Sequence, residues 1–155
     1  MRLSKKSEYA VRALVCLAAP DAPPMLPIQE IARQERIPKK FLEQVLLALN
    51  KAGLVQSVRG KAGGYALRGA PAAMTLGDIV RAVDGPLDPL PCTNREAPIK
   101  CADCVSLEQC WLRSVMVEVG SAFDAALDQV TLVEMCRRAG PMRQRRGAPA
   151  LMYEI

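Results

Sequence analysis

The sequence of 155 residues contains no histidine, and aromatic residues make up only 4% of it. It therefore lacks the side chain that enzymes use most often as a general base, and it shows neither a nucleophile constellation nor a phosphate-binding glycine loop. No stretch approaches the roughly 18 consecutive apolar residues that a membrane span needs, and the first residues lack the apolar core of a secretory signal. We therefore expect a cytoplasmic protein that is not an enzyme, with neither a membrane nor a small organic substrate among its partners.

Acidic charge is scarce in the N-terminal half. Residues 1–68 contain 12 Lys and Arg against 5 Asp and Glu, a balance of +7, whereas residues 69–155 contain 9 against 11, a balance of −2. A basic half of this kind favours a polyanionic partner, most often nucleic acid. From charge alone, a solvated basic face without a partner is an equally good interpretation.

Ala, Leu and Val dominate the hydrophobic half of the composition, which favours helices. The spacing of apolar residues predicts helices over 4–18 and 39–52, with a short helix from Ile28 between them. Pro27 suits the first turn of that short helix. A tight break at 35–38 separates the second helix from the third, which is the pattern of a helix-turn-helix.

A pair of short strands is expected after the third helix. Gly53 suits the end of that helix, residues 54–59 alternate as a strand does, and residues 65–67 return as a second strand. A hairpin in this place is a wing. Gly60, Gly63 and Gly64 bracket the turn between the strands, which is expected to need positive φ.

Threonine caps mark two further helices. Thr75-x-x-Asp78 resembles a capping box and starts a helix through Val83, and Thr131-x-x-Glu134 starts a final short helix. Between them, residues 107–128 carry a long apolar stripe. The stripe consists of Leu112, Val115, Met116, Val119, Phe123, Ala126 and Leu127.

The helix over 107–128 is too long to pack wholly on so small a domain, so we expect it to join the subunits of a homodimer. The expected fold class is mainly α, a winged helix-turn-helix with a two-stranded wing and a long C-terminal dimerisation helix. The expected parts are a winged helix-turn-helix DNA-binding domain at 1–84, a cysteine-rich loop at 85–106, the dimerisation helix with a short terminal helix at 107–138, and a flexible tail at 139–155.

Three motifs, taken in order, resemble the Rrf-two (Rrf2) family of winged-helix transcription regulators over residues 1–138. Residues 1–4 with 9–13 look like the family's first helix, and Phe41-Leu42-Glu43-Gln44 looks like its recognition helix. Ser57-Val58-Arg59-Gly60, followed by Gly63-Gly64-Tyr65 and Leu67, looks like its wing. The resemblance implies a homodimer that binds a near-palindromic double-stranded DNA operator, with the recognition helix in the major groove and the wing at the minor groove.

Helix-turn-helix geometry assigns DNA contacts in the same places. Lys39 and Lys40 are expected to hold phosphates, while Glu43 and Gln44 are candidates for reading cytosine and adenine. Arg59 at the wing tip suits a narrow minor groove. The candidate DNA-binding residues are Lys39, Lys40, Glu43, Gln44, Ser57, Arg59 and Lys61. An exposed carboxylate without a partner is the alternative for Glu43.

Four cysteines stand close together as C-x8-C-x2-C-x5-C, at Cys92, Cys101, Cys104 and Cys110. Thiols in a reducing compartment are first read as metal ligands or redox groups. Thiolates suit iron–sulfur clusters and zinc alike, although structural zinc usually shows two short cysteine pairs and only one is present. Cys16 and Cys136 lie in helical patterns and are expected to be buried structural residues.

For these cysteines the family resemblance implies a [2Fe–2S] or [4Fe–4S] cluster held by three of them, and Cys92, Cys104 and Cys110 match best. The fourth ligand is then Cys101 or an acidic residue from the partner's first helix, for which Glu8 is the candidate. Some members use a histidine just after the last cysteine, where this chain has Arg113.

The expected function is therefore DNA-binding transcription regulation controlled by an iron–sulfur cluster that senses redox state, iron or nitric oxide. One alternative is a zinc-stabilised or metal-free DNA-binding repressor without cluster sensing. An iron–sulfur electron carrier or enzyme is a second alternative, which the missing catalytic motifs disfavour.

Overall fold

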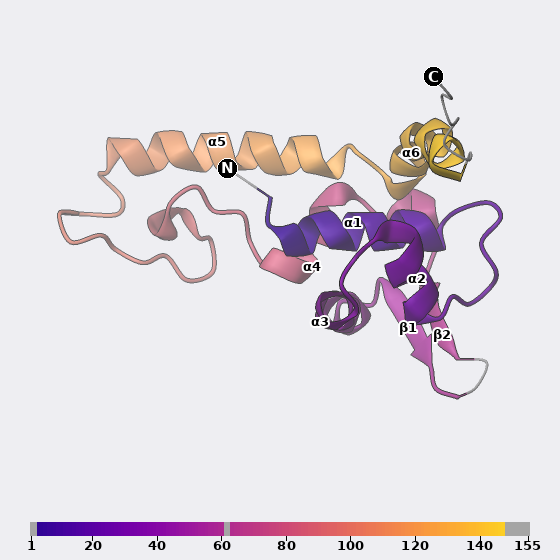
Figure 1. Ribbon diagram of the computed structural model, residues 1–155. Coiled ribbons are helices and arrows are strands. Elements are labelled where there is room, and N and C mark those ends of the chain that lie inside the picture. The colour runs from indigo at the N-terminus through magenta and orange to yellow at the C-terminus, as the bar shows by residue number, and fades with distance from the viewer. Residues whose placement is uncertain (1–2, 61–62, 148–155) are drawn as a thin grey trace, which may run out of the picture.

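The computed structural model describes residues 3–60 and 63–147, with side chains described up to residue 140. Most helices and one hairpin form a head, and a long helix, α5, runs beside the head and projects beyond it (Figure 1). The helices are α1 (Lys5–Leu17), α2 (Ile28–Glu35), α3 (Lys39–Lys51), α4 (Leu76–Asp84), α5 (Trp111–Asp128) and α6 (Leu132–Gly147), with short 3-10 turns η1 (Pro71–Ala73) and η2 (Pro91–Thr93). The strands are β1 (Val55–Val58) and β2 (Gly64–Leu67).

The expected mainly α, winged helix-turn-helix fold is confirmed, and α2 and α3 form its helix-turn-helix. The turn between them is possible because Arg36 adopts a left-handed backbone, with φ of 52°. Ile37 is only 3% exposed, so it anchors the turn in the core. Pro38 is the N-cap of α3. Pro27 is the N-cap of α2, one position before the first turn in which we expected it.

α1 lies inside the head because it packs against α2, α3 and α4. Its start is fixed by Ser4, whose side chain accepts hydrogen bonds from the backbone N–H groups of Lys6 and Ser7. The hydroxyls of Ser4 and Ser7 also donate to the carboxylate of Asp84, at 2.6 and 2.7 Å, and so tie α1 to the end of α4. The largest fully buried side chains of the core are Leu14, Ile31, Leu42, Leu46, Leu49, Ile79 and Leu132.

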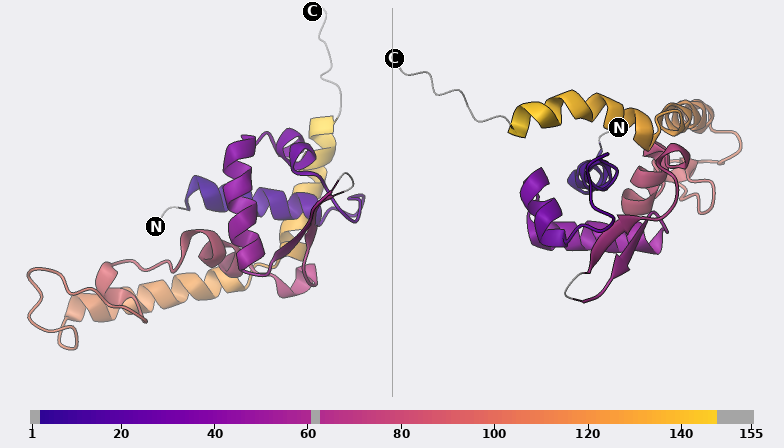
Figure 2. Two further views of the ribbon diagram at one scale, coloured as in Figure 1. Left: turned by 90° about the horizontal axis from the view of Figure 1, so that it is seen from below. Right: turned by 90° about the vertical axis from the view of Figure 1, so that its right-hand side faces the viewer.

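The wing is an antiparallel pair in which Val55 lies opposite Leu67. Gly60, where the chain leaves β1, has the expected positive φ, at 122°. The wing and α3 lie on the side of the head opposite α5 and α6 (Figures 1 and 2). The expected DNA-binding elements and the expected dimerisation helix therefore occupy different faces.

Close backbone approach, in addition to turn geometry, explains the paired glycines of the wing. A Cβ on Gly63 would collide with the carbonyl oxygen of Val58, and a Cβ on Gly64 would lie 2.5 Å from the carbonyl oxygen of Leu26. Gly64 itself lies within β2 and has no positive φ. Its missing side chain lets Leu26 and Tyr65 exchange backbone hydrogen bonds of 3.0 and 2.9 Å.

Two helix boundaries in the C-terminal half differ from those expected. α5 begins at Trp111 and not at 107, because residues 107–109 form bends and the N-cap, Cys110, has an extended backbone. α6 continues to Gly147, so residues 139–147 are helical and do not belong to the tail expected from position 139. Within the described ranges, no helix is both long and apolar enough to cross a membrane.

Candidate DNA-binding surface and cysteine-rich segment

α3 presents one polar side to solvent. Lys39, Lys40, Glu43 and Gln44 are all exposed, and the ammonium of Lys39 lies 4.0 Å from the carboxylate of Glu43. The opposite side of the helix is buried in the core through Leu42, Val45, Leu46 and Leu49. Helical periodicity therefore places the four candidate residues together at the start of an exposed helix face, where a groove of DNA has access to them.

The wing continues this surface. Ser57 and Arg59 are exposed on β1 and just after it. The Asn50 side-chain amide donates to the Ser57 hydroxyl at 3.0 Å, which links the end of α3 to the wing. Because of this link, Ser57 serves the alignment of the two elements. Lys61, the remaining candidate, lies outside the described residues.

Arg12 holds the helix-turn-helix in place, a function that the sequence analysis did not assign to it. Its guanidinium donates to the carboxylate of Glu35 at 3.3 Å and also to the Glu35 carbonyl oxygen at the end of α2. It lies 5.8 Å from the centre of the Tyr9 ring. Glu35 is buried, so its charge requires such a partner. Charge alone gives no signal for this pair, because the two residues are far apart in sequence.

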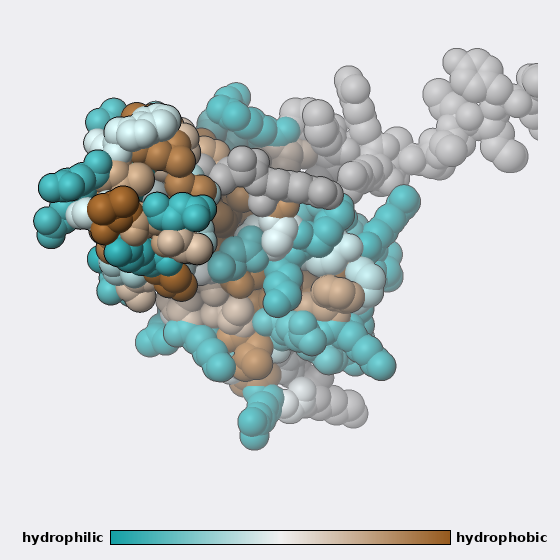
Figure 3. Space-filling model, turned by 90° about the vertical axis from the view of Figure 1, so that its left-hand side faces the viewer, coloured by the Kyte–Doolittle hydropathy of each residue, from teal (hydrophilic) through white to brown (hydrophobic). Residues whose placement is uncertain are grey.

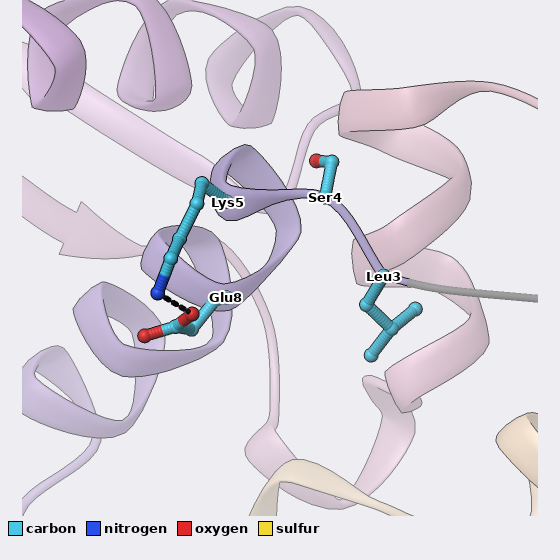
Figure 4. A pocket seen from close by; sticks show the side chains of 4 residues that line it. All are labelled: Leu3, Ser4, Lys5 and Glu8. Carbon is cyan, nitrogen blue, oxygen red and sulfur yellow. Dashed lines mark hydrogen bonds and ion pairs between the residues drawn. The ribbon is translucent and has the colours of Figure 1, made fainter.

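Glu8 lies near the start of α1, in a shallow pocket of about 300 Å³ that Leu3, Ser4 and Lys5 also line (Figure 4). Its carboxylate is 2.5 Å from the ammonium of Lys5 and 3.5 Å from the guanidinium of Arg12. The hydrogen bond from Lys5 lowers the pKa of Glu8, so the group is ionised. Within one chain α1 lies away from the free end of α5 (Figures 1 and 2).

The four clustered cysteines are free thiols in different environments. Cys92 is buried in η2, Cys101 is exposed, and Cys104 and Cys110 are half-buried. Burial raises the pKa of the Cys104 thiol, and the neighbouring thiols of Cys101 and Cys110 raise it further. The structure thus brings the thiols of Cys101, Cys104 and Cys110 near one another. Among the described residues, no three Cys, Asp or Glu side chains converge closely enough to hold a metal ion.

The other two cysteines lie in helices, as expected. Cys16 is buried in α1, and its thiol donates to the side-chain oxygen of Gln34 at 3.2 Å. Cys136 is half-buried in α6 and packs against the core. Neither residue belongs to the cysteine segment, which we define as residues 85–110.

Two arginines fasten the cysteine segment to α5. Arg113, in the first turn of α5, donates through Nε to the carbonyl oxygen of Cys92 at 2.8 Å. Arg95 donates to the hydroxyl of Ser121 at 2.8 Å. The segment also lies directly on α5 at Gly120, where a Cβ would be 3.1 Å from Pro89. In the sequence, Arg113 stands out only because some relatives have a histidine at that position. No sequence pattern indicates that it donates to the backbone carbonyl of Cys92.

The donors of the cysteine segment suit a thiolate-bound metal group. Four thiols within one segment are the donor type of iron–sulfur and zinc centres. Cys110 is the N-cap of α5, and Cys92 is fastened to the first turn of that helix by Arg113, so both ends of the four-cysteine stretch are held at one place. The part between them, residues 94–109, carries no helix or strand. The residues therefore fit such a group in chemistry and in anchoring.

A polar joint connects α5 to the head. The Arg81 guanidinium of α4 lies 2.6 Å from the carboxylate of Asp128 and 3.8 Å from that of Asp124, both on α5. It also reaches Asp78 of its own helix, at 3.3 Å. Since Asp84 of α4 bonds to α1, charged and polar contacts run from α5 through α4 to the head.

α5 has an apolar face that no part of the described chain covers. Leu112, Val115 and Val119 are exposed along one side of the helix, and the small residues Ala122 and Ala126 continue that side. Trp111, Val105 and Ile99 add exposed apolar surface at the projecting end. Figure 3 shows apolar side chains among hydrophilic ones at this end. A contiguous row of exposed apolar side chains of this kind is typical of interaction surfaces.

Comparison with known proteins identifies relatives over most of the chain. The model of the Rrf2 family, described as an iron-dependent transcriptional regulator, matches residues 3–138. A putative HTH-type transcriptional regulator, rrf2-like, from Rhodobacter capsulatus is 42% identical over 142 residues, which cover 90% of this chain and 95% of the relative.

Solved structures agree with this match. The structure of CymR, the global cysteine regulator of Bacillus subtilis, superposes with a TM-score of 0.67 at 28% identity and covers 89% of this chain and 98% of CymR. IscR of T. potens superposes with a TM-score of 0.64 at 30% identity and covers 99% of this chain and 97% of IscR. The chain is a DNA-binding transcriptional regulator and not an enzyme, and it belongs to the Rrf2 family.

Proposed function

We propose that this regulator binds its operator as a homodimer and that an iron–sulfur cluster, held by the cysteine segment, controls the binding. The observation that carries the proposal is the double anchoring of the four-cysteine stretch on α5, by Arg113 at Cys92 and by the N-cap at Cys110. A change at the thiols therefore acts on α5 directly. The signal is redox state, iron or nitric oxide, and the protein works in the cytoplasm, where thiols stay reduced.

In the proposed complex, α3 enters the major groove and the wing approaches the minor groove. Lys39 and Lys40 hold phosphates, and Glu43 and Gln44 contact base edges. Arg59 and Lys61 are proposed to approach the minor groove from the wing. Ser57 contacts the backbone of the DNA. The support is the shared exposure of these side chains, apart from that of Lys61, on the face opposite α5 and α6.

Cys92, Cys104 and Cys110 are the proposed cluster ligands, and the fourth ligand is Cys101 or Glu8 of the partner subunit. When bound, the cluster supplies a centre that oxidation, nitric oxide or iron loss can remove. Arg113 holds the backbone of Cys92 against α5, and Arg95 holds the next part of the segment to Ser121. These bonds transmit the position of the segment to the helix.

Two α5 helices, one from each subunit, are proposed to pack through their exposed apolar faces. The Arg81 joint then links each helix to its own head, so a shift of α5 changes the spacing of the two α3 helices. Such coupling requires that the two states of the segment bind DNA with different free energies.

A zinc-stabilised or metal-free repressor is the second candidate. It is favoured by the absence, within the described residues, of three ligand side chains already arranged around one point. The resemblance to CymR, a cysteine regulator, also shows that family membership does not fix the signal.

Anaerobic purification tests the proposal. The protein should be brown and contain both iron and acid-labile sulfide. Cys92→Ala, Cys104→Ala and Cys110→Ala should each lose most of the colour, and Cys16→Ala, in the head, is the matched control that should keep it. Whichever of Cys101→Ala and Glu8→Ala alters the spectrum identifies the fourth ligand. Stoichiometric zinc without sulfide, together with equal operator affinity with and without metal, would leave the second candidate.

Operator binding tests the docking. Gln44→Ala and Arg59→Ala should reduce specific binding, since a good base contact contributes about 1–3 kcal/mol of discrimination. Lys39→Ala should weaken binding to all sequences and reduce the salt slope by about 1. A larger change of sequence preference in Lys39→Ala than in Gln44→Ala would contradict this docking.

A further inference from the structure

Cys101 and Cys104 are the first and last residues of a four-residue turn. The backbone N–H of Cys104 donates to the carbonyl oxygen of Cys101 at 3.1 Å, and in such a turn the two Cα atoms lie less than about 7 Å apart. Lys100 precedes the turn and Val105 follows it, and the Lys100 ammonium donates to the carbonyl oxygen of Val105 at 3.1 Å. This bond holds the two ends of the turn together. A disulfide needs Cα atoms about 4.4–6.8 Å apart, so the backbone of this turn suits one.

The two thiols are free, near each other and reachable from solvent. Cys101 is exposed and Cys104 is half-buried. The Cys101 thiol lies close enough to help raise the pKa of the Cys104 thiol. Ala102 and Asp103, between them, are exposed, so no core residue has to move when the sulfurs approach. Cys92, by contrast, is buried in η2.

We propose that Cys101 and Cys104 are a redox pair that oxidises to an intrachain disulfide. With hydrogen peroxide as the oxidant, the more exposed Cys101 sulfur attacks a peroxide oxygen, which gives a sulfenic acid and one water. The Cys104 sulfur then attacks the Cys101 sulfur, an S–S bond forms, and the sulfenic oxygen leaves as a second water. Two thiols are oxidised and one peroxide is reduced, and a dithiol reductant reverses the change.

The disulfide itself does not depend on a cluster, whereas its regulatory consequence rests on the proposed function. Cys104 is one of the three proposed ligands, and a sulfur in a disulfide cannot bind iron as a thiolate. Oxidation of the pair therefore blocks loading of the cysteine segment until the pair is reduced. Cys101 thereby makes cluster loading depend on redox state, whether or not it is itself the fourth ligand.

The test uses the full-length chain, reduced, stripped of metal by a chelator, freed of reductant and treated with hydrogen peroxide. Trypsin cleaves after Lys100 and Arg113 and releases one peptide with three cysteines. A second protease that cleaves after Asp103 and Glu108 separates these cysteines, so only a disulfide keeps two fragments together. Mass spectrometry should find the Cys101 and Cys104 fragments joined, with the loss of two hydrogen masses, and separate again after reduction.

The three cysteines supply matched variants. Cys110→Ser should form the same linkage as the parent, whereas Cys101→Ser and Cys104→Ser should not form it, with circular dichroism showing that each variant is folded. Cys110 as the main partner of either thiol, sulfinic acid without a linkage, or unreacted thiols would each overturn the proposal. Because the protein in this test carries no metal, its result is independent of whether a cluster is found by anaerobic purification.

Discussion

Charges on the apolar face of α5 should separate the proposed dimer, and the structure sets the size of the effect. Complete burial of a valine side chain contributes about 1.5–3 kcal/mol. Val115 and Val119 are 45% and 46% exposed, so about half of that remains to be gained on association. The two residues in each of two subunits then contribute about 3–6 kcal/mol in total. Since about 1.4 kcal/mol is a factor of ten, the variant V115E/V119E should raise the dimer dissociation constant about 10²- to 10⁴-fold.

Sedimentation equilibrium over a range of protein concentrations measures that constant. V58E is the matched control, because Val58 is similarly exposed, at 54%, but lies on the wing. It should leave the dimer unchanged and weaken DNA binding instead. An unchanged dissociation constant in V115E/V119E, or an equal increase in V58E, would refute the assignment of this face to the dimer.

Three further predictions concern stability. Gly64→Ala places a methyl group against the carbonyl of Leu26, so urea unfolding should show a free energy of unfolding lower by about 1–3 kcal/mol. In the control, Gly140→Ala, the added methyl group meets no neighbour, so the free energy of unfolding should not decrease. Arg81→Met removes the polar joint to α5 and should cost about 1 kcal/mol at low salt, a difference that must shrink at high salt if ion pairs are its cause. Two arginines of α6 lower the pKa of Glu134 to about 2. Between about pH 4.5 and pH 2 the unfolded chain therefore binds more protons than the folded one, so the free energy of unfolding should decrease as the pH is lowered through that range. Acid titration of Glu134→Gln should show a smaller fall there, and an identical fall would contradict the assignment.

The sequence was sufficient for the helix-turn-helix because its signals are local. Helical spacing places Leu42, Val45, Leu46 and Leu49 on one buried side of α3, and that alone leaves the candidate DNA contacts on the other side. The expected capping box at Thr75 and Asp78 is present at the start of α4. These elements depend on neighbours three or four residues apart, which a single sequence displays.

Contacts between distant residues could not be read in this way. No pattern among neighbouring residues indicates that Arg113 donates to the carbonyl of Cys92. Nor does any such pattern indicate that Leu26 leaves no room for a side chain at Gly64. The spacing of the cysteines indicates thiolate chemistry but not the environment of each thiol, since Cys92 is buried and Cys101 is exposed.

The joint at Arg81 makes α5 a lever. The helix has 18 residues, so it is about 27 Å long, and the charged contacts at Asp124 and Asp128 hold it near its C-terminal end. A tilt of about 5° around that fulcrum displaces the free end by about 2 Å. Conversely, a force that the cysteine segment exerts on the far end of α5 acts over nearly the whole length of the helix, so it produces a large turning moment at the contacts with the head. Stronger ion pairs between Arg81 and Asp124 or Asp128 should therefore restrict the tilting of α5 without changing the thiols or the DNA-binding surface.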